Sequence, residues 1–158
     1  MKGNQKLIDK LNDLLSDEMT AINQYLVHAE MAENWGYEGL HDMIRARAVT
    51  EMKHMNKLIE RILFLEGTPI VSRLKDIHIS PEVPGMFQND LALEMGAVRG
   101  YNEAVRLAAE VGDNASRDMF EGILGDEDGH VDEIEGNQDR IQQMGLQVYL
   151  STQVGEAE

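Results

Sequence analysis

Two copies of a Glu…Glu-x-x-His pattern hold the residues of this chain that are best suited to chemistry. Each member of the first copy recurs 76 positions later, which pairs Glu18 with Glu94, Glu51 with Glu127 and His54 with His130. In both copies, 33 positions separate the first glutamate from the second. Four carboxylates and two imidazoles in two equivalent triplets are the ligands that a pair of iron or manganese ions requires. The duplication therefore predicts a site for two metal ions.

The elements that must position these ligands are helices. Apolar residues recur at i, i+3, i+4 and i+7 in four long segments, which predicts helices over residues 4–34, 38–65, 82–111 and 114–144. One glutamate of the duplicated pattern lies inside the apolar stripe of each segment and should face the core. Buried charges are normally paired or bound to metal, because burial of an unpaired carboxylate is costly. Two histidines cannot neutralise four glutamates, whereas two divalent cations can.

Glycines mark where the predicted helices turn back. Gly36 and Gly112 lie close to the midpoint between the two glutamates of each copy. If the chain reverses there, the two glutamates of each hairpin meet at one level, about 25 Å from the turn at 1.5 Å per residue. We therefore expect two helical hairpins that bring all four carboxylates together.

The segment between the hairpins is too long for a tight turn. Residues 66–82, fully extended, could reach roughly 55 Å, which exceeds the length of a bundle. Ser80 and Pro81 are typical of a helix start, and a short helix is expected after Gly145. The sequence thus predicts one all-α domain over residues 1–158, a four-helix bundle with a long crossover between helices 2 and 3 and a short C-terminal fifth helix.

A third Glu-x-x-His pair, Glu38 and His41, serves as an internal control. Its counterparts 76 positions later are Asn114 and Arg117. Because this pair has no partner triplet, we interpret it as a surface pair in the first turn of a helix. His28 and His78 belong to no motif and are expected at the surface or in packing roles.

Further residues near the pattern each allow two interpretations. Tyr25 and Tyr101, seven residues after a ligand glutamate, are either core aromatics or hydrogen-bond donors and redox-active phenols beside the metals. Asp126 either accepts the ring N–H of a ligand histidine or is a surface acid. Met52 is rotated about 100° from the interior, which favours a subunit interface over an exposed methionine. Most of the ten methionines are expected to fill the core.

Composition excludes several classes of function. The formal net charge of −15 argues against a nucleic-acid partner and is compatible with attracting cations, although acidic surfaces also simply confer solubility. No run of 18 apolar residues could span a membrane, and the start of the chain lacks the apolar core of a signal peptide. The absence of cysteine excludes disulfides and thiolate metal sites. A cytoplasmic location fits these features.

The chain strongly resembles the bacterioferritin family over nearly its whole length. The shared segments are the MKG start, AINQY at 21–25, EMKH at 51–54, ERILFLEG at 60–67, DLALE at 90–94, SRDMF at 116–120 and DEDGH at 126–130. This resemblance implies a ferritin-like fold assembled from dimers into a hollow 24-subunit cage, which oxidises Fe(II) with O2 or H2O2 and stores the Fe(III) mineral. The six residues of the duplicated pattern would be the ferroxidase ligands, with Glu51 and Glu127 bridging the di-iron centre.

The resemblance also implies a haem. In the family a b-type haem lies between two subunits with one methionine from each as axial ligand, and Met52 matches that position. A small ferredoxin is the usual electron donor for iron release. This chain departs from many members at Ala46 and Thr50, where a histidine and an aspartate form an inner-surface iron site, and Arg47 adds a positive charge nearby.

Two other classes of function fit the pattern. One is a di-iron enzyme that acts on an organic substrate or a peroxide without storage; a monomer or dimer that never accumulates mineral would favour it. The other is a haem-bearing electron-transfer or structural bundle with a vestigial glutamate cluster. Retention of haem without binding of two metals per chain would favour this second alternative.

Overall fold

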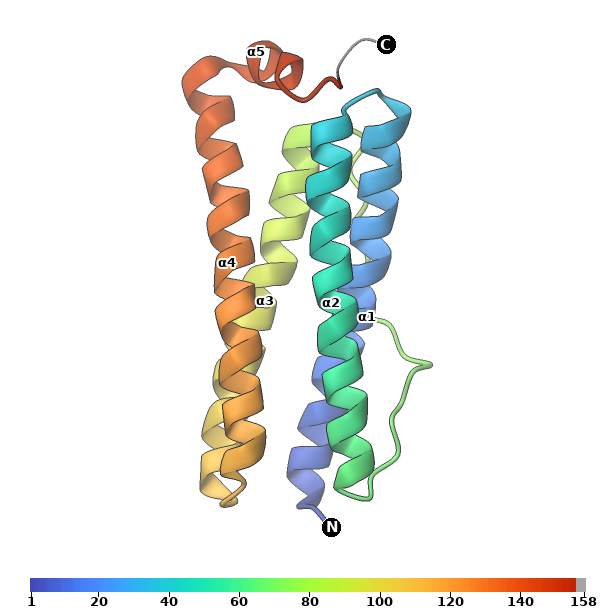
Figure 1. Ribbon diagram of the computed structural model, residues 1–158, viewed down its shortest axis with the longest axis vertical. Helices are drawn as coiled ribbons and strands as arrows, with labels where there is room; N and C mark the ends of the chain where they lie inside the picture. Colours follow the sequence, from blue (N-terminus) through green and yellow to red (C-terminus); the bar gives the residue numbers. More distant parts are fainter. Residues whose placement is uncertain (156–158) are drawn as a thin grey trace.

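The computed structural model describes residues 1–155 and contains four long helices and one short one (Figure 1). They are α1 Gln5–Asn34, α2 Glu38–Phe64, α3 Val83–Glu110, α4 Asn114–Met144 and α5 Leu146–Ser151. The first two form one hairpin and the next two the other, while α5 lies across the end of the bundle where α4 ends (Figure 1). The predicted all-α bundle with a long crossover and a short fifth helix is confirmed.

Each hairpin turns at a glycine in a left-handed conformation. Gly36 has φ 83° and Gly112 has φ 75°, a region that residues with a Cβ rarely adopt. The amide of Tyr37 donates to the carbonyl of Ala32 at 2.9 Å, and that of Gly36 donates to Glu33. The same pair of bonds recurs at Gly112. These are Schellman C-caps, which satisfy the last carbonyls of α1 and α3 and start the reversal of the chain.

The start of α3 differs from the prediction. The helix begins at Val83 with Glu82 as N-cap residue, rather than at Pro81. The hydroxyl of Ser80 accepts from the amide of Glu82 and donates to its carbonyl, so Ser80 closes a local turn before the helix. The amide of Ser80 donates to Nε2 of His28 on α1. Because this residue is bound to α1, the chain enters α3 two residues later than Ser80-Pro81 indicates.

Polar side chains of α1 bind the crossover along its path. Five of them recur every fourth residue, and each accepts from a crossover amide, donates to a crossover carbonyl or does both: Asn12, Ser16, Thr20, Gln24 and His28. An i, i+4 row is inclined to the helix axis, so the crossover follows an oblique track along α1 from the end of α2 to the start of α3 (Figure 1). This polar row, called the α1 ladder below, satisfies backbone groups that an irregular segment cannot pair by itself.

Apolar stripes of the four helices form the core around one polar layer. Leu11, Leu15, Leu58 and Phe120 are fully buried near the end of the bundle where the chain starts. A second apolar cluster contains Phe87, Ile134 and Tyr149, the last of which belongs to α5. None of the helices in residues 1–155 is long and apolar enough to cross a membrane.

Candidate metal centre

Each long helix contributes one glutamate to the polar layer. Glu18, Glu51, Glu94 and Glu127 come from α1, α2, α3 and α4 respectively, and each residue is only 1–2% exposed. The hairpin geometry places the glutamates of each pair at one level, as the turn positions predict. Because the helices pack through their apolar stripes, a glutamate within the stripe points into the bundle.

These glutamates and two histidines form two groups that share two members. Glu18 and His54 belong to one group, Glu94 and His130 belong to the other, and Glu51 and Glu127 belong to both. Within each group the candidate ligand atoms all lie within 4.8 Å of one another. Below, the groups are called the Glu18–His54 site and the Glu94–His130 site. Two shared carboxylates between two sites are the arrangement that bridging ligands of a metal pair would have.

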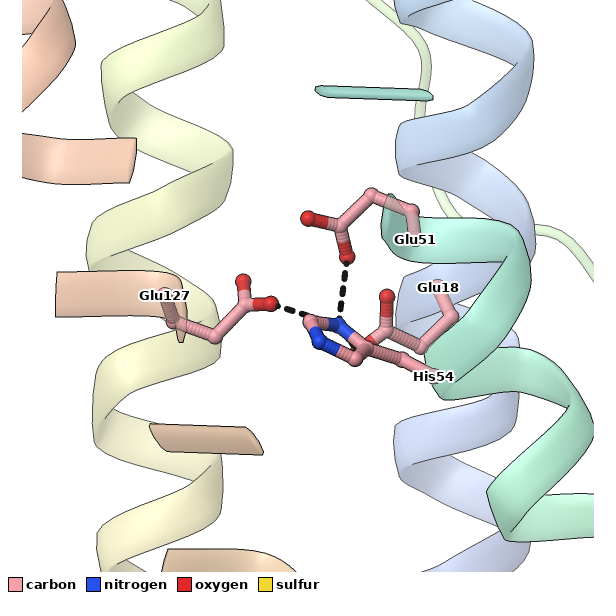
Figure 2. A group of neighbouring side chains, drawn as sticks. All are labelled: Glu18, Glu51, His54 and Glu127. Atoms are coloured by element: carbon pink, nitrogen blue, oxygen red, sulfur yellow. Dashed lines mark hydrogen bonds and ion pairs between the residues drawn. The ribbon is translucent and has the colours of Figure 1, made fainter. Parts of the chain in front are cut away.

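The histidines are oriented toward the shared glutamates. Nδ1 of His54 lies 2.9 Å from Glu127 Oε1 and 3.3 Å from Glu51 Oε2, so its ring sits between the two hairpins (Figure 2). Nδ1 of His130 lies 2.9 Å from Glu51 and 3.2 Å from Glu94. Both rings therefore direct one nitrogen into the layer of carboxylates, as a metal ligand must.

Several atoms of the layer have no hydrogen-bond partner among residues 1–155. They are buried, and they comprise Glu18 Oε2, Glu51 Oε1, Glu94 Oε2, Glu127 Oε1 and His130 Nδ1. The imidazole contacts with Glu51 Oε1 and Glu127 Oε1 are close enough for ion pairs but lack the direction of a hydrogen bond. Buried polar atoms are normally satisfied, and a set of unsatisfied carboxylate oxygens around one space calls for a cation. The oxygen and imidazole donors suit a first-row divalent metal. The layer can therefore hold a metal pair.

Protonation compensates part of the charge when no cation is bound. Burial and the neighbouring Glu51 raise the pKa of Glu18 well above its ordinary value. Burial also raises the pKa of Glu127, to about 12. For His130, burial acts to lower the pKa, but contacts with Glu51 and Glu94 outweigh it and raise the pKa to about 9. Near neutral pH, cations and protons therefore compete for these groups.

Two tyrosines hold the two unshared glutamates. The hydroxyl of Tyr101 donates to Glu18 Oε1 and that of Tyr25 donates to Glu94 Oε1, each at 2.5 Å. Each bond joins one hairpin to the other. The structure thus places both tyrosines directly behind a candidate ligand, in hydrogen-bond contact with it.

Asp126 lies beside the histidine of the opposite hairpin. Its Oδ2 is 2.8 Å from Nε2 of His54, while Nδ1 of that ring faces the carboxylate layer. The equivalent position in the first half, Thr50, donates its hydroxyl to the carbonyl of Ala46 in its own helix. His130 consequently receives no carboxylate from that position. The ligand pattern is duplicated, but its hydrogen-bonding support is not.

Met52 belongs to neither site. It follows Glu51 on α2 and is half-buried, whereas Glu51 is fully buried. Val49, one helical turn earlier, is 38% exposed. The control pair also lies apart from the centre, since His41 contacts Glu30, Glu33 and Asp42 near the end of the bundle.

A buried ionic network beside the centre was missed by sequence reasoning. Asp90 Oδ1 lies 2.8 Å from Nδ1 of His28, and its Oδ2 accepts from Arg47 at 3.1 Å. All three residues are buried, and His28 is thus not a surface residue. The available signal was the position of Asp90, which lies one turn before Glu94 in an apolar stripe. Arg47 also stacks on the ring of Tyr25, with Cζ 4.8 Å from the centroid.

A cleft connects the centre with the surface between α1 and α3. It measures about 320 Å³, and its buried walls include Glu18 and Glu94. Lys75 of the crossover also lines it and forms ion pairs with Asp13 and Asp17 of α1. The cleft thus extends from charged surface residues to the buried carboxylates.

Four long helices that each direct a glutamate inward, two of them with an added histidine, define a ferritin-like bundle with two groups of side chains that could hold metal ions. Comparison with known proteins agrees. The family model Ferritin, described as a ferritin-like domain, matches residues 8–144. The chain therefore belongs to the ferritin family, within which its curated relatives are bacterioferritins.

Three of these relatives show the extent of the similarity. A bacterioferritin from Rhodobacter capsulatus is 43% identical over 135 residues, covering 85% of this chain and 84% of that protein. One from Brucella melitensis biotype 1 is 36% identical over 149 residues, with 94% and 92% covered. One from Streptomyces coelicolor is 35% identical over 158 residues, with 100% and 95% covered.

Proposed function

We propose that this chain oxidises Fe(II) to Fe(III) at the dimetal centre and stores the product as a mineral. The observation that carries this proposal is the layer of four buried carboxylates and two imidazoles, several of whose inward-facing atoms lack partners among residues 1–155. Membership of the ferritin family, with bacterioferritins as relatives, supports iron as the metal. The cleft between α1 and α3 would admit both Fe(II) and a small oxidant.

In this reaction iron is a substrate. Two Fe(II) each lose one electron, and the two electrons with two protons reduce O2 to H2O2, or H2O2 to two waters. The carboxylates of Glu18, Glu51, Glu94 and Glu127 stabilise the higher charge that develops on iron, so their role is electrostatic rather than acid–base. His54 and His130 complete the ligand sets as neutral donors.

Replacement of Glu18 or Glu94 by alanine tests the assignment. Each variant should lose the fast phase of Fe(II) oxidation, followed by absorbance after mixing with O2 or H2O2, while the assembly stays intact by sedimentation. Glu38→Ala is the matched control, because it removes a glutamate from the Glu-x-x-His pair that lies apart from the centre. Survival of fast oxidation in the Glu18 and Glu94 variants would refute the site.

Storage requires an assembly, which we propose to be a cytoplasmic 24-subunit cage built from dimers, with each chain folded as one domain over residues 1–158. The relatives named bacterioferritin support this proposal. Iron loading of the purified protein should yield particles with a dense mineral core under electron microscopy. A monomer or dimer without mineral would instead favour the enzyme of an organic substrate or peroxide.

We further propose a b-type haem between two subunits, with Met52 of each chain as axial ligand. The residues fit, since a half-buried neutral thioether on α2 lies next to the exposed apolar Val49. A bound haem would supply one-electron redox chemistry, and a small ferredoxin is the electron donor that we propose for iron release.

Met52→Leu should abolish the haem absorbance and leave Fe(II) oxidation intact. Retention of haem without binding of two metals per chain would favour the electron-transfer alternative.

A further inference from the structure

The duplicated ligands lie in environments that are not duplicated. Tyr101 belongs to an apolar cluster that also contains Leu14, Ala104 and Ile123. At the positions related to these three by the 76-residue offset, the chain has ionisable residues, and Asp90 is the equivalent of Leu14. His28 is the equivalent of Ala104, and Arg47 is the equivalent of Ile123.

Within residues 1–155, the ionic network therefore lies on only one side of the centre. Asp90 bonds His28 and Arg47, and the Arg47 guanidinium covers the ring of Tyr25, whose hydroxyl bonds Glu94. Arg47 also approaches Glu133 of α4 at 3.4 Å. A fixed cation thus lies behind the Glu94–His130 site, whereas hydrocarbon lies behind the Glu18–His54 site.

A second asymmetry concerns the two histidines. Nε2 of His54 is 2.8 Å from the Asp126 carboxylate, and the side chain is 1% exposed. His130 is 13% exposed, and the position equivalent to Asp126 is Thr50. A carboxylate that accepts the outer N–H of a ligand histidine fixes its tautomer and raises its basicity. Of the two rings, Asp126 supports only His54 in this way.

Both asymmetries favour tighter cation binding at the Glu18–His54 site. For a cation in the Glu18–His54 site, Asp126 adds a negative charge behind the ligand histidine and holds the ring of His54 in place. A cation in the Glu94–His130 site has a less constrained histidine, and the positive charge of Arg47 lies behind the Tyr25 ring that bonds Glu94. Asp90 and Glu133 offset much of the charge of Arg47, so the larger contribution comes from Asp126.

We propose that the two metal sites are unequal, with the Glu18–His54 site retaining its cation and the Glu94–His130 site exchanging it. This inference rests on the proposed function, because it specifies which half of the same centre delivers iron onward. Asp126 is a positioning residue in this scheme, since it acts on the metal through His54. Thr50 is the feature that leaves the other half weak.

Titration with Co(II) in the absence of oxidant tests the inference without relying on oxidation. The native assembly should bind two Co(II) per chain in two resolved steps, with dissociation constants that differ by about tenfold or more. Asp126→Asn should weaken the tighter step by about 10- to 100-fold. Asp128→Asn is the matched control, because it makes the same change two residues further along α4 at an exposed position.

Thr50→Asp provides the converse test. By the relation between the halves, this carboxylate would support His130 as Asp126 supports His54, and the weaker step should tighten by about tenfold or more. Anomalous diffraction from crystals with one Co(II) per chain should place the ion in the Glu18–His54 site. The Co(II) d–d spectrum of the first step should change in Asp126→Asn and remain unchanged in Asp128→Asn.

The outcomes separate the two claims. Two Co(II) bound with equal constants, or a first ion in the Glu94–His130 site, would overturn the inequality and leave the proposed ferroxidase centre standing. Failure to bind two Co(II) per chain would overturn the proposed function itself. If Asp126→Asn and Asp128→Asn weaken the tighter Co(II) step equally, the effect comes from the loss of negative charge in general. That result would refute the positioning role of Asp126.

Discussion

The tyrosines show at the scale of single residues how the centre is kept ready for a cation. Each hydroxyl donates a hydrogen bond to Oε1 of one glutamate, and Oε2 of the same glutamate has no hydrogen-bond partner among residues 1–155. Burial, followed by the charges of Glu94 and Glu18 respectively, raises the pKa of Tyr25 and Tyr101 well above the ordinary value. The phenols therefore stay protonated and donate. One oxygen of each carboxylate is fixed by the phenol, and the other remains available to the proposed metal pair.

Loss of one such bond should weaken metal binding more than it weakens the fold. Tyr101→Phe leaves the apolar packing of the ring intact and removes the donor to Glu18. We expect the affinity of the Glu18–His54 site for Co(II) to fall by about tenfold. Tyr149→Phe is the control, because it removes a buried hydroxyl that bonds Asn137, outside the metal sites. Equal Co(II) affinity in both variants would contradict this role of Tyr101.

Metal uptake should release protons from the centre. His130 has its pKa raised to about 9 and is therefore protonated at pH 7 in the cation-free protein, yet it must be neutral to bind a metal. As pH rises toward this pKa, the proton competes less, so Co(II) affinity should increase between pH 6 and 8. Each released proton contributes about tenfold per pH unit. His130→Ala should reduce the slope by one proton, and an unchanged slope would exclude His130 from the ligand set.

At the scale of elements, the two hairpins could be predicted and the path of the crossover could not. Apolar periodicity and the glycines near the midpoints of the glutamate pairs determine the hairpins, because burial and left-handed turns leave sequence signals. The α1 ladder recurs every fourth residue and looks like a solvated stripe. Its partners are backbone groups of the crossover, which any sequence offers. The difference between Asp126 and Thr50 could be read from the sequence, but the ionic network could not, since Arg47, Asp90 and His28 meet through tertiary packing.

The α1 ladder should contribute measurably to stability. The Asn12 side chain donates to the carbonyl of Thr68 and accepts from the amide of Ile70. Asn12→Ala should lower the free energy of unfolding by about 1–3 kcal/mol, because both backbone groups lose their partner in a partly buried position. Asn23→Ala is the control, since Asn23 is exposed and donates to the carbonyl of Met19 in its own helix. Chemical denaturation and proteolysis within residues 66–82 measure the effect, and equal losses would contradict it.

At the scale of the whole molecule, the layer of buried glutamates lowers the stability of the cation-free fold. The chain has a formal net charge of −15 and buries four glutamates in one layer. Burial and the neighbouring Glu51 raise the pKa of Glu18, which means that its charged form is disfavoured in the folded, cation-free protein. An uncharged layer would fold more easily, and the proposed metal pair would offset the cost of the four buried glutamates.

Removal of one buried carboxyl group should therefore stabilise the cation-free protein and weaken its response to metal. We expect Glu18→Gln without metal to melt at a higher temperature than the cation-free parent chain. Burial raises the pKa of Glu18, so folding near neutral pH requires this carboxyl to take up a proton, and an amide of the same shape avoids that cost. Saturation with Co(II) at 100 times the dissociation constant should stabilise the parent by about 2.7 kcal/mol per site. The variant should gain markedly less, because Glu18 contributes to one of the two sites. Thermal unfolding of both proteins, with Co(II) and with chelator, decides the matter. If Glu18→Gln melts lower than the parent in chelator and still gains as much from Co(II), the four glutamates are structural and the centre is not a metal site.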